Sequence, residues 1–369
     1  MTEQTTRYSR PKFVYLLFGL TLIPLVAWIL SERQPLAERI ARTVAAHPDA
    51  VKNSGINGEV DAYNLSKFLS AVPDHKLEGA FLSTESWFHW ALAATSAASA
   101  IVLIWLLFDR GGVRFWRAVV LVCITAIIGM AALFALQFVG EMALLDSHVF
   151  LDWRKMLLLI VLKIIGGLYY ATMYAPEQVP FFVTLGGFVF AVGFFEELLK
   201  IVAAAANASE DGRDVDWRTV CWLGLISGIW FGVLEGIFYS SSHYNGVATQ
   251  EMYVVRFVSC VGLHTIWSGI TGLRLARNLK WNNGKIDGRL GYLSWMLRSL
   301  APAVVLHGTY DTFLQRDMPI FALAVAVLSF VLFAWLFESC RRNGLPEKPK
   351  DSLNIGGIAP KDWYRRGRR

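Results

Sequence analysis

Two adjacent glutamates and a lysine stand inside an apolar stretch of this chain. Glu196, Glu197 and Lys200 occur in the run FFEELLK, and no other charged residue lies between Pro180 and Ala206. A carboxylate positioned beside a water can act as a general base, and a lysine three or four residues further along a helix can pair with a carboxylate. Adjacent residues point about 100° apart around a helix. The two glutamates therefore have different roles, one facing a reaction site and the other pairing with Lys200.

Three later apolar stretches also carry groups that can bind metals or move protons. They contain Glu235 in FGVLEGIFY, His264 in GLHTIWSG, and His307 and Asp311 in LHGTYD. His307 and Asp311 are four residues apart, so on a helix they lie on one face and can reach one shared atom.

Together these segments bring two imidazoles and up to four carboxylates into apolar surroundings. Such carboxylates must be protonated, paired with Lys200 and Arg256, or bound to a cation. A divalent metal is the simplest of these solutions. Imidazole nitrogen and carboxylate oxygen are normal ligands of Zn²⁺, and a spare carboxylate beside a metal-held water is a usual general base for hydrolysis. The donor set alone does not identify the metal.

Composition determines which elements must position these residues. The chain has 369 residues, of which 55% are hydrophobic, 14% aromatic and 17% charged, which excludes an ordinary soluble protein. We predict an all-α, polytopic integral membrane protein of eight to nine transmembrane helices. The candidate spans are Phe13 to Leu30, Trp87 to Phe108, Trp116 to Phe138, Met156 to Tyr174, Pro180 to Ala206, Arg218 to Tyr239, Met252 to Leu275, Leu290 to Leu314 and Ile320 to Phe337. Ionisable groups at the bilayer centre cost about 2.5 to 3.5 kcal/mol each, so each one inside a span is a functional hypothesis.

The distribution of basic residues predicts the topology. Basic residues between Arg274 and Arg289, in the C-terminal tail and in the run DRGGVR all favour the cytoplasmic side. Nine full spans do not satisfy all three segments, whereas eight do. Our hypothesis is that Met156 to Tyr174, which contains Lys163 and a GG pair, is re-entrant and that both termini are cytoplasmic.

We predict four parts along the chain. Residues 1–86 form an N-terminal anchor helix and an extramembrane spacer, in which Leu36, Ile40 and Val44 have helical spacing. Residues 87–179 form accessory transmembrane helices, residues 180–338 form the catalytic core, and residues 339–369 form a basic disordered tail that contacts anionic lipid. The partners expected are the lipid bilayer and a membrane-anchored protein, and no nucleic acid.

Four motifs in order carry a family resemblance. They are EExxK (Glu196, Glu197, Lys200), FxxxE (Phe231, Glu235), a helix with His264 followed by TIWSGITG, and HxxxD (His307, Asp311). The set resembles the PrsW family of intramembrane proteases, which is related to the CAAX prenyl endopeptidases and the bacteriocin-processing enzymes. The resemblance implies a helical fold with the site between helices, and hydrolysis of peptide bonds in membrane-anchored substrates such as a single-span anti-sigma factor. The membrane would be a bacterial inner (plasma) membrane.

The resemblance also implies roles for the site residues. Glu196 or Glu197 activates water, Lys200 fixes the other glutamate, and Glu235, His264, His307 and Asp311 bind a metal or position the water. The CAAX-type pattern has His where this chain has Glu235, Asn where it has Asp311, and an Arg one residue beyond Lys200. These departures point to the PrsW branch, and the added carboxylates favour a divalent metal, Zn²⁺, over a metal-free glutamate mechanism.

Two other function classes remain open from the residues. Intramembrane Glu, His and Asp also build the proton relays of cation- or proton-coupled transporters. Transporters usually show repeats with broken helices in two halves, whereas here the ionisable residues concentrate in the second half of the chain, which counts against transport. The third possibility is a non-catalytic scaffold that binds a membrane partner.

Overall fold

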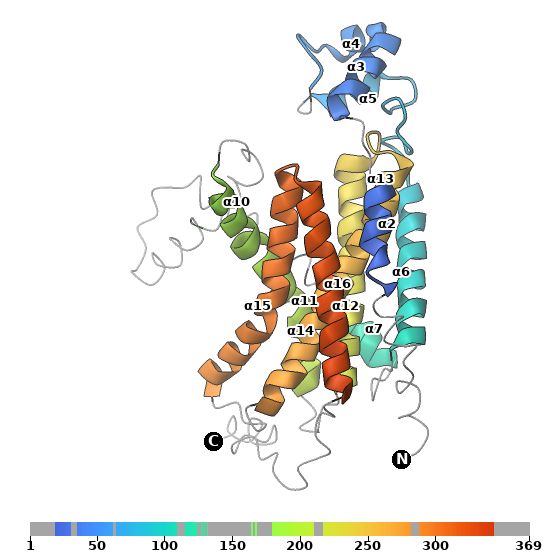
Figure 1. Cartoon of the computed structure of the whole chain (residues 1–369). Helices are drawn as coiled ribbons and strands as arrows, with labels where there is room; N and C mark the ends of the chain where they lie inside the picture. The colour runs from blue at the N-terminus through green and yellow to red at the C-terminus, as the bar shows by residue number, and fades with distance from the viewer. Residues whose placement is uncertain are drawn as a thin grey trace, which may run out of the picture. The chain divides into compact units, whose positions relative to one another are not determined.

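The computed structural model of the chain describes residues 19–30, 35–61, 64–108, 115–123, 179–209, 217–281 and 288–342, with a few single positions between 127 and 167. Every regular element within these residues is a helix (Figure 1). The prediction of an all-α protein is therefore confirmed for the part of the chain that the structure describes.

The helices follow the chain in a simple order. They are α2 (Leu22–Leu30), α3 (Leu36–Ala46), α4 (Pro48–Ser54), α5 (Leu65–Ala71), α6 (Phe88–Leu107), α7 (Phe115–Cys123), α10 (Phe181–Gly187), η3 (Phe188–Gly193), α11 (Phe194–Ser209), α12 (Trp217–Tyr239), η4 (Ser240–Tyr244), α13 (Gln250–Val254), η5 (Val255–Cys260), α14 (Val261–Trp281), α15 (Gly288–Gln315) and α16 (Pro319–Arg342). Among the described residues, π-helical segments (η) join α10 to α11 and α13 to α14, and another follows α12.

Several of these helices can cross a membrane. Five described segments are long and apolar enough: Phe88–Leu107, Phe181–Ile201, Trp217–Tyr244, Gln250–Asn278 and Pro319–Arg342. The chain is therefore an integral membrane protein with several candidate spans. Helix α15 has 28 residues but carries several charged groups and is not among the five. The predicted span at 156–174 and much of that at 116–138 lie outside the described residues, so the total of eight or nine stays a prediction.

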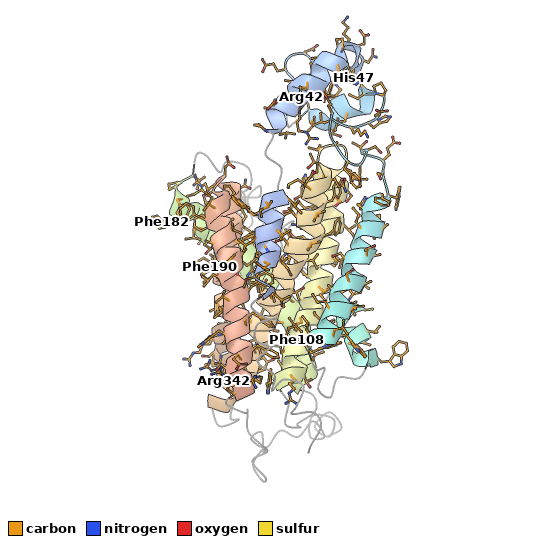
Figure 2. All side chains as sticks on the ribbon, turned by 45° about the vertical axis from the view of Figure 1, so that its right-hand side comes forward. Arg42, His47, Phe108, Phe182, Phe190 and Arg342 are labelled. Atoms are coloured by element: carbon orange, nitrogen blue, oxygen red, sulfur yellow. The ribbon has the colours of Figure 1, made fainter. Side chains whose placement is uncertain are left out.

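Some apolar side chains on these helices point outward. Phe182 on α10 and Phe190 on η3 are 81% and 62% exposed and project from the ribbon in Figure 2. Outward-facing aromatic side chains on a span are suited to contact with lipid, where no polar partner is needed.

The chain divides into two compact units. Unit 1 comprises Met1–Leu22, Leu103–Phe231 and Leu263–Arg369, and unit 2 comprises Ile23–Val102 and Gly232–Gly262. The sequence-based domain boundaries after residues 86, 179 and 338 stay predictions.

Unit 2 contains a small packed body of short helices. Helix α3 confirms the predicted helix through Leu36, Ile40 and Val44, and α3, α4 and α5 pack around a core that includes Phe68 and Leu77, both fully buried. Backbone hydrogen bonds join residues 77–82 to residues 246–248, for example from Leu77 N–H to the Gly246 carbonyl at 2.8 Å. The segment predicted as a spacer is thus a folded body tied to the loop between η4 and α13.

Glycines allow the helices of unit 1 to approach each other closely. A Cβ atom on Gly228 of α12 would lie 2.3 Å from the carbonyl oxygen of His264 on α14, and one on Gly308 of α15 would lie 2.5 Å from Cα of Val189 on η3. Only glycine fits at such contacts, and small residues are a usual means of bringing membrane helices together. These two contacts place the backbone of α14 against α12 and the backbone of α15 against the helix that leads into FFEELLK.

Candidate active site

The two glutamates and the lysine occupy the first two turns of α11, directly after the π-helical segment η3. Their exposed fractions are 6% for Glu196, 1% for Glu197 and 0% for Lys200. π-Helical segments are rare and are often found at functional sites. Three ionisable side chains are therefore buried together at the point where the π-helix ends.

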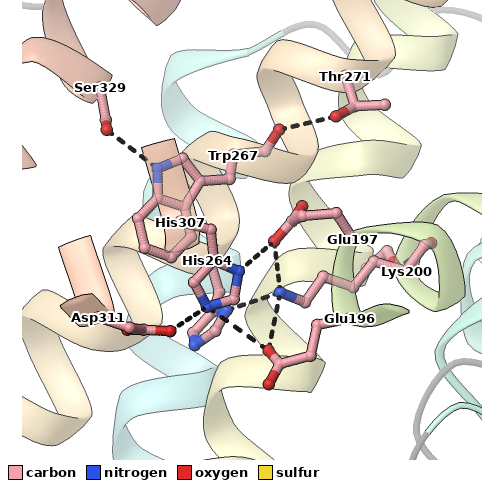
Figure 3. A network of polar contacts seen from close by, with 10 residues as sticks. Glu196, Glu197, Lys200, His264, Trp267, Thr271, His307, Asp311 and Ser329 are labelled. Carbon is pink, nitrogen blue, oxygen red and sulfur yellow. Dashed lines mark hydrogen bonds and ion pairs between the residues drawn. The ribbon is translucent and has the colours of Figure 1, made fainter. Parts of the chain in front are cut away.

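Lys200 pairs mainly with the second glutamate. Its Nζ atom lies 2.7 Å from Oε1 of Glu197 and 3.6 Å from Oε2 of Glu196 (Figure 3). The ring of Phe231, on α12, covers the ammonium group at 4.2 Å from its centroid, which stabilises a buried cation. Lys200 therefore holds Glu197 more closely than Glu196, a choice that the spacing left open.

His307 on α15 connects both glutamates with Asp311. Its Nδ1–H donates to Oε1 of Glu197 at 3.0 Å, while Nε2 lies 3.6 Å from Oε2 of Glu196 and 3.3 Å from Oδ2 of Asp311. The four-residue spacing correctly predicted the contact between His307 and Asp311. Glu197 thus orients the ring so that Nε2 faces the other two carboxylates.

His264 on α14 reaches the same place from a third helix. Its Nδ1 lies 2.7 Å from Nζ of Lys200, and its ring lies edge-on to His307 with centroids 5.1 Å apart. It also contacts Phe231, at 5.6 Å between ring centroids. The close approach of α14 to α12 at Gly228 positions this imidazole.

Three of these side chains meet the requirements of a metal site. One ligand atom each of Glu196, His264 and His307 lies within 4.8 Å of the others, and all three residues are buried. Donor atoms about 2.0 to 2.2 Å from a tetrahedral metal lie about 3.3 to 3.6 Å from each other. The separations of His307 Nε2 from the Glu196 and Asp311 oxygens, 3.6 and 3.3 Å, match that spacing. The residues present therefore fit a divalent metal, with Asp311 as a fourth neighbour.

The family comparison agrees with this geometry. The family model for PrsW family intramembrane metalloproteases matches residues 115–337, which is more than half of the 369 residues. The chain belongs to the PrsW family. It is thus a member of a family of intramembrane metalloproteases, that is, of peptidases. No curated protein and no solved structure matches the chain.

Glu235 of this PrsW protein pairs with an arginine, whereas Glu197 pairs with a lysine and a histidine. Glu235 lies in unit 2, where its Oε1 is 2.8 Å from Nη2 of Arg256 on η5. The Arg256 guanidinium lies over the ring of Tyr239, 4.3 Å from the centroid. The role of Glu235 as a metal ligand stays a prediction from the motif, and Arg256 is the cation that balances its charge.

Sequence reasoning assigned no role to two aromatic residues of the PrsW site. Phe231 was part of the FxxxE motif, and the structure shows that it covers the Lys200 ammonium. Trp267 stacks on the ring of His307, with centroids 4.3 Å apart. Trp267 belongs to the run TIWSGITG, and its position three residues after His264 places both on one face of α14.

Proposed function

We propose that this PrsW-family protein hydrolyses peptide bonds of membrane-anchored proteins, with a glutamate-activated water and a divalent metal, Zn²⁺. The observation that carries the proposal is the buried meeting of Glu196, His264 and His307 in a chain that belongs to a family of metalloproteases. The substrate we favour is a single-span protein such as an anti-sigma factor. The membrane we favour is a bacterial inner membrane, with the basic tail of residues 339–369 in the cytoplasm.

The two glutamates have separate tasks in this proposal. Glu197 accepts hydrogen bonds from Lys200 and His307, so its charge is balanced and its oxygen is engaged. The contacts of Glu196 Oε2 to Lys200 Nζ and His307 Nε2 are both 3.6 Å, longer than those of Glu197 to the same two side chains. Glu196 is therefore the carboxylate that takes the proton from the attacking water and passes it to the leaving amine, while Glu197 orients His307.

His264, His307 and Asp311 are the residues that would hold the metal, and Glu196 would act next to them as the base rather than as a ligand. When bound, a divalent metal makes a water more acidic and polarises the scissile carbonyl. The motif adds Glu235 to this set as a predicted ligand. Burial keeps bulk water away, so the charges of these residues act more strongly on the reacting bond than they would in solvent.

Lys200 has to change partners when His264 binds a metal. An ammonium group only donates hydrogen bonds, so the 2.7 Å contact needs Nδ1 of His264 as acceptor. If either nitrogen of His264 held a metal, Nδ1 could no longer accept a hydrogen bond from Lys200. Lys200 would then lose its contact to His264 and keep those to Glu197 and Glu196.

The experiment compares membrane proteins from cells that express the wild type, Glu196→Gln or the control Glu251→Gln, whose side chain is exposed on α13. We expect one or a few membrane-anchored proteins to accumulate uncleaved in Glu196→Gln only. The same membrane proteome in all three strains, or uptake of an ion by reconstituted wild-type protein without any cleavage, would overturn the proposal.

A further inference from the structure

The face of the His307 ring is covered by the indole of Trp267. The ring centroids are 4.3 Å apart and the planes differ by 20°, which is a stacked arrangement. Trp267 is only 1% exposed, and its indole is also edge-on to His264, with centroids 5.5 Å apart. One indole thus contacts both imidazoles of the candidate metal site, as seen in Figure 3.

The polar contacts of His307 do not fix its ring completely. Glu197 accepts the hydrogen bond from Nδ1–H at 3.0 Å, and Nε2 lies 3.3 Å from Oδ2 of Asp311. A single hydrogen bond at Nδ1 leaves the ring some freedom to rotate about its Cβ–Cγ bond. A stacked aromatic face opposes this rotation, because rotation would break the contact between the rings.

The indole is itself held in place by another helix. Trp267 Nε1–H donates to Oγ of Ser329 on α16 at 3.0 Å, and Ser329 in turn donates to the Val325 carbonyl at 2.8 Å. Ser329 is fully buried. Helix α16, which carries none of the four motifs, is therefore linked to an imidazole on α15 through a residue of α14.

We propose that Trp267 is a positioning residue: anchored by Ser329, it fixes the plane of the His307 ring so that the in-plane lone pair of Nε2 points between Glu196 and Asp311. The proposal rests on the proposed function, because the plane of this ring affects the reaction only if His307 acts in the site. A metal accepts a nitrogen lone pair in the ring plane, so a tilted ring would be a poorer ligand.

The test uses purified full-length protein in detergent with four variants. Trp267→Leu removes the stacked ring, Trp267→Phe keeps an aromatic face, and Ser329→Ala removes the anchor. The matched control is Trp295→Leu: Trp295 is also buried, at 5% exposed, and its Nε1–H also donates across the α14–α15 pair, to the Leu275 carbonyl at 3.1 Å.

The first readout is the NMR signal of the His307 ring in metal-free protein, assigned with His307→Asn. Protons above an indole face are shielded, so the wild-type signals lie upfield. We expect them to move downfield in Trp267→Leu, partly in Ser329→Ala, little in Trp267→Phe and not in Trp295→Leu. Unchanged signals in Trp267→Leu, or an equal change in Trp295→Leu, would overturn the proposal.

The second readout is Zn²⁺ affinity, measured by titration of the same proteins. We expect Trp267→Leu to weaken binding about 10- to 100-fold, as changes beside a metal ligand usually do, and Trp295→Leu to leave it unchanged. Full affinity in Trp267→Leu would contradict the proposal. A wild-type protein that binds no Zn²⁺ would contradict the proposed metal site instead, and the NMR readout would still decide the role of Trp267.

Discussion

Two groups of buried charges in this protein balance their charge in different ways. In unit 1, three carboxylates (Glu196, Glu197 and Asp311) share one lysine and two histidines. In unit 2, one carboxylate, Glu235, pairs with one guanidinium, Arg256, at 2.8 Å. Among the contacts of the described residues given above, the first group has more carboxylates than ammonium groups, whereas the second joins one carboxylate to one guanidinium.

The difference indicates what each group is for. Buried anions in excess must take up protons or a cation, and a site that requires a cation can bind a metal. A balanced pair requires neither, and removal of one partner leaves the other charge buried without compensation. We therefore expect a bound metal to stabilise the protein through the group in unit 1. We expect mutation of Arg256 alone to destabilise the protein through the pair in unit 2.

The largest effect on stability is expected at the balanced pair. Arg256→Leu should destabilise the protein by about 3 to 5 kcal/mol, because the Glu235 carboxylate stays buried without its cation. The double variant Arg256→Leu with Glu235→Leu should recover most of this loss. Unfolding in detergent, followed by circular dichroism, gives the free energies. A double variant as unstable as Arg256→Leu would show that the loss does not come from a Glu235 charge left without its cation.

The next effect is specific to the acid-rich group. Zn²⁺ at about 100 times its Kd should stabilise the wild type by about 2.7 kcal/mol. We expect this increment to disappear in His307→Ala and to persist in Arg256→Leu and in the control His243→Ala, whose side chain is exposed. If Glu235 is also a ligand, as the motif predicts, Glu235→Gln will lose the increment too. Zn²⁺ stabilisation that survives in His307→Ala would contradict the proposed site.

A smaller effect is expected for the ring that covers Lys200. Phe231→Leu should cost about 1 to 2 kcal/mol more than Phe333→Leu, because only Phe231 contacts a desolvated ammonium. Both rings are buried, at 0% and 1% exposed, so the comparison removes most of the packing effect. Equal losses of unfolding free energy in the two variants would mean that the cation–π contact contributes nothing measurable.

The smallest effect is expected at the end of α16. Glu338, whose side chain is 12% exposed, forms ion pairs with Arg341 and Arg342, whose side chains are 27% and 70% exposed. Partly hydrated pairs of this kind contribute about 0 to 1 kcal/mol, so Glu338→Gln should change the free energy of unfolding by no more than that. A loss comparable to that of Arg256→Leu would remove the distinction between a pair whose cation is buried, as Arg256 is, and pairs whose cations are partly hydrated.

The sequence by itself determined the class of protein, its helical nature and the family resemblance, and it named candidate site residues. Hydropathy, motif order and the four-residue spacing of His307 and Asp311 are properties of the linear chain, and the family comparison and the contact between these two residues agree with them. The roles assigned to the site residues are still predictions, since they concern reactivity rather than position.

Only the tertiary structure decided which glutamate Lys200 holds, that Arg256 pairs with Glu235, and that Trp267 stacks on His307. Helices that are apolar on all sides carry no periodic signal for the face that points inward. Their rotation and separation depend on close backbone contacts, such as those at Gly228 and Gly308, between residues far apart in the chain. For that reason, the sequence named candidate acids and imidazoles and the neighbours within one helix, but not the partners that meet across helices.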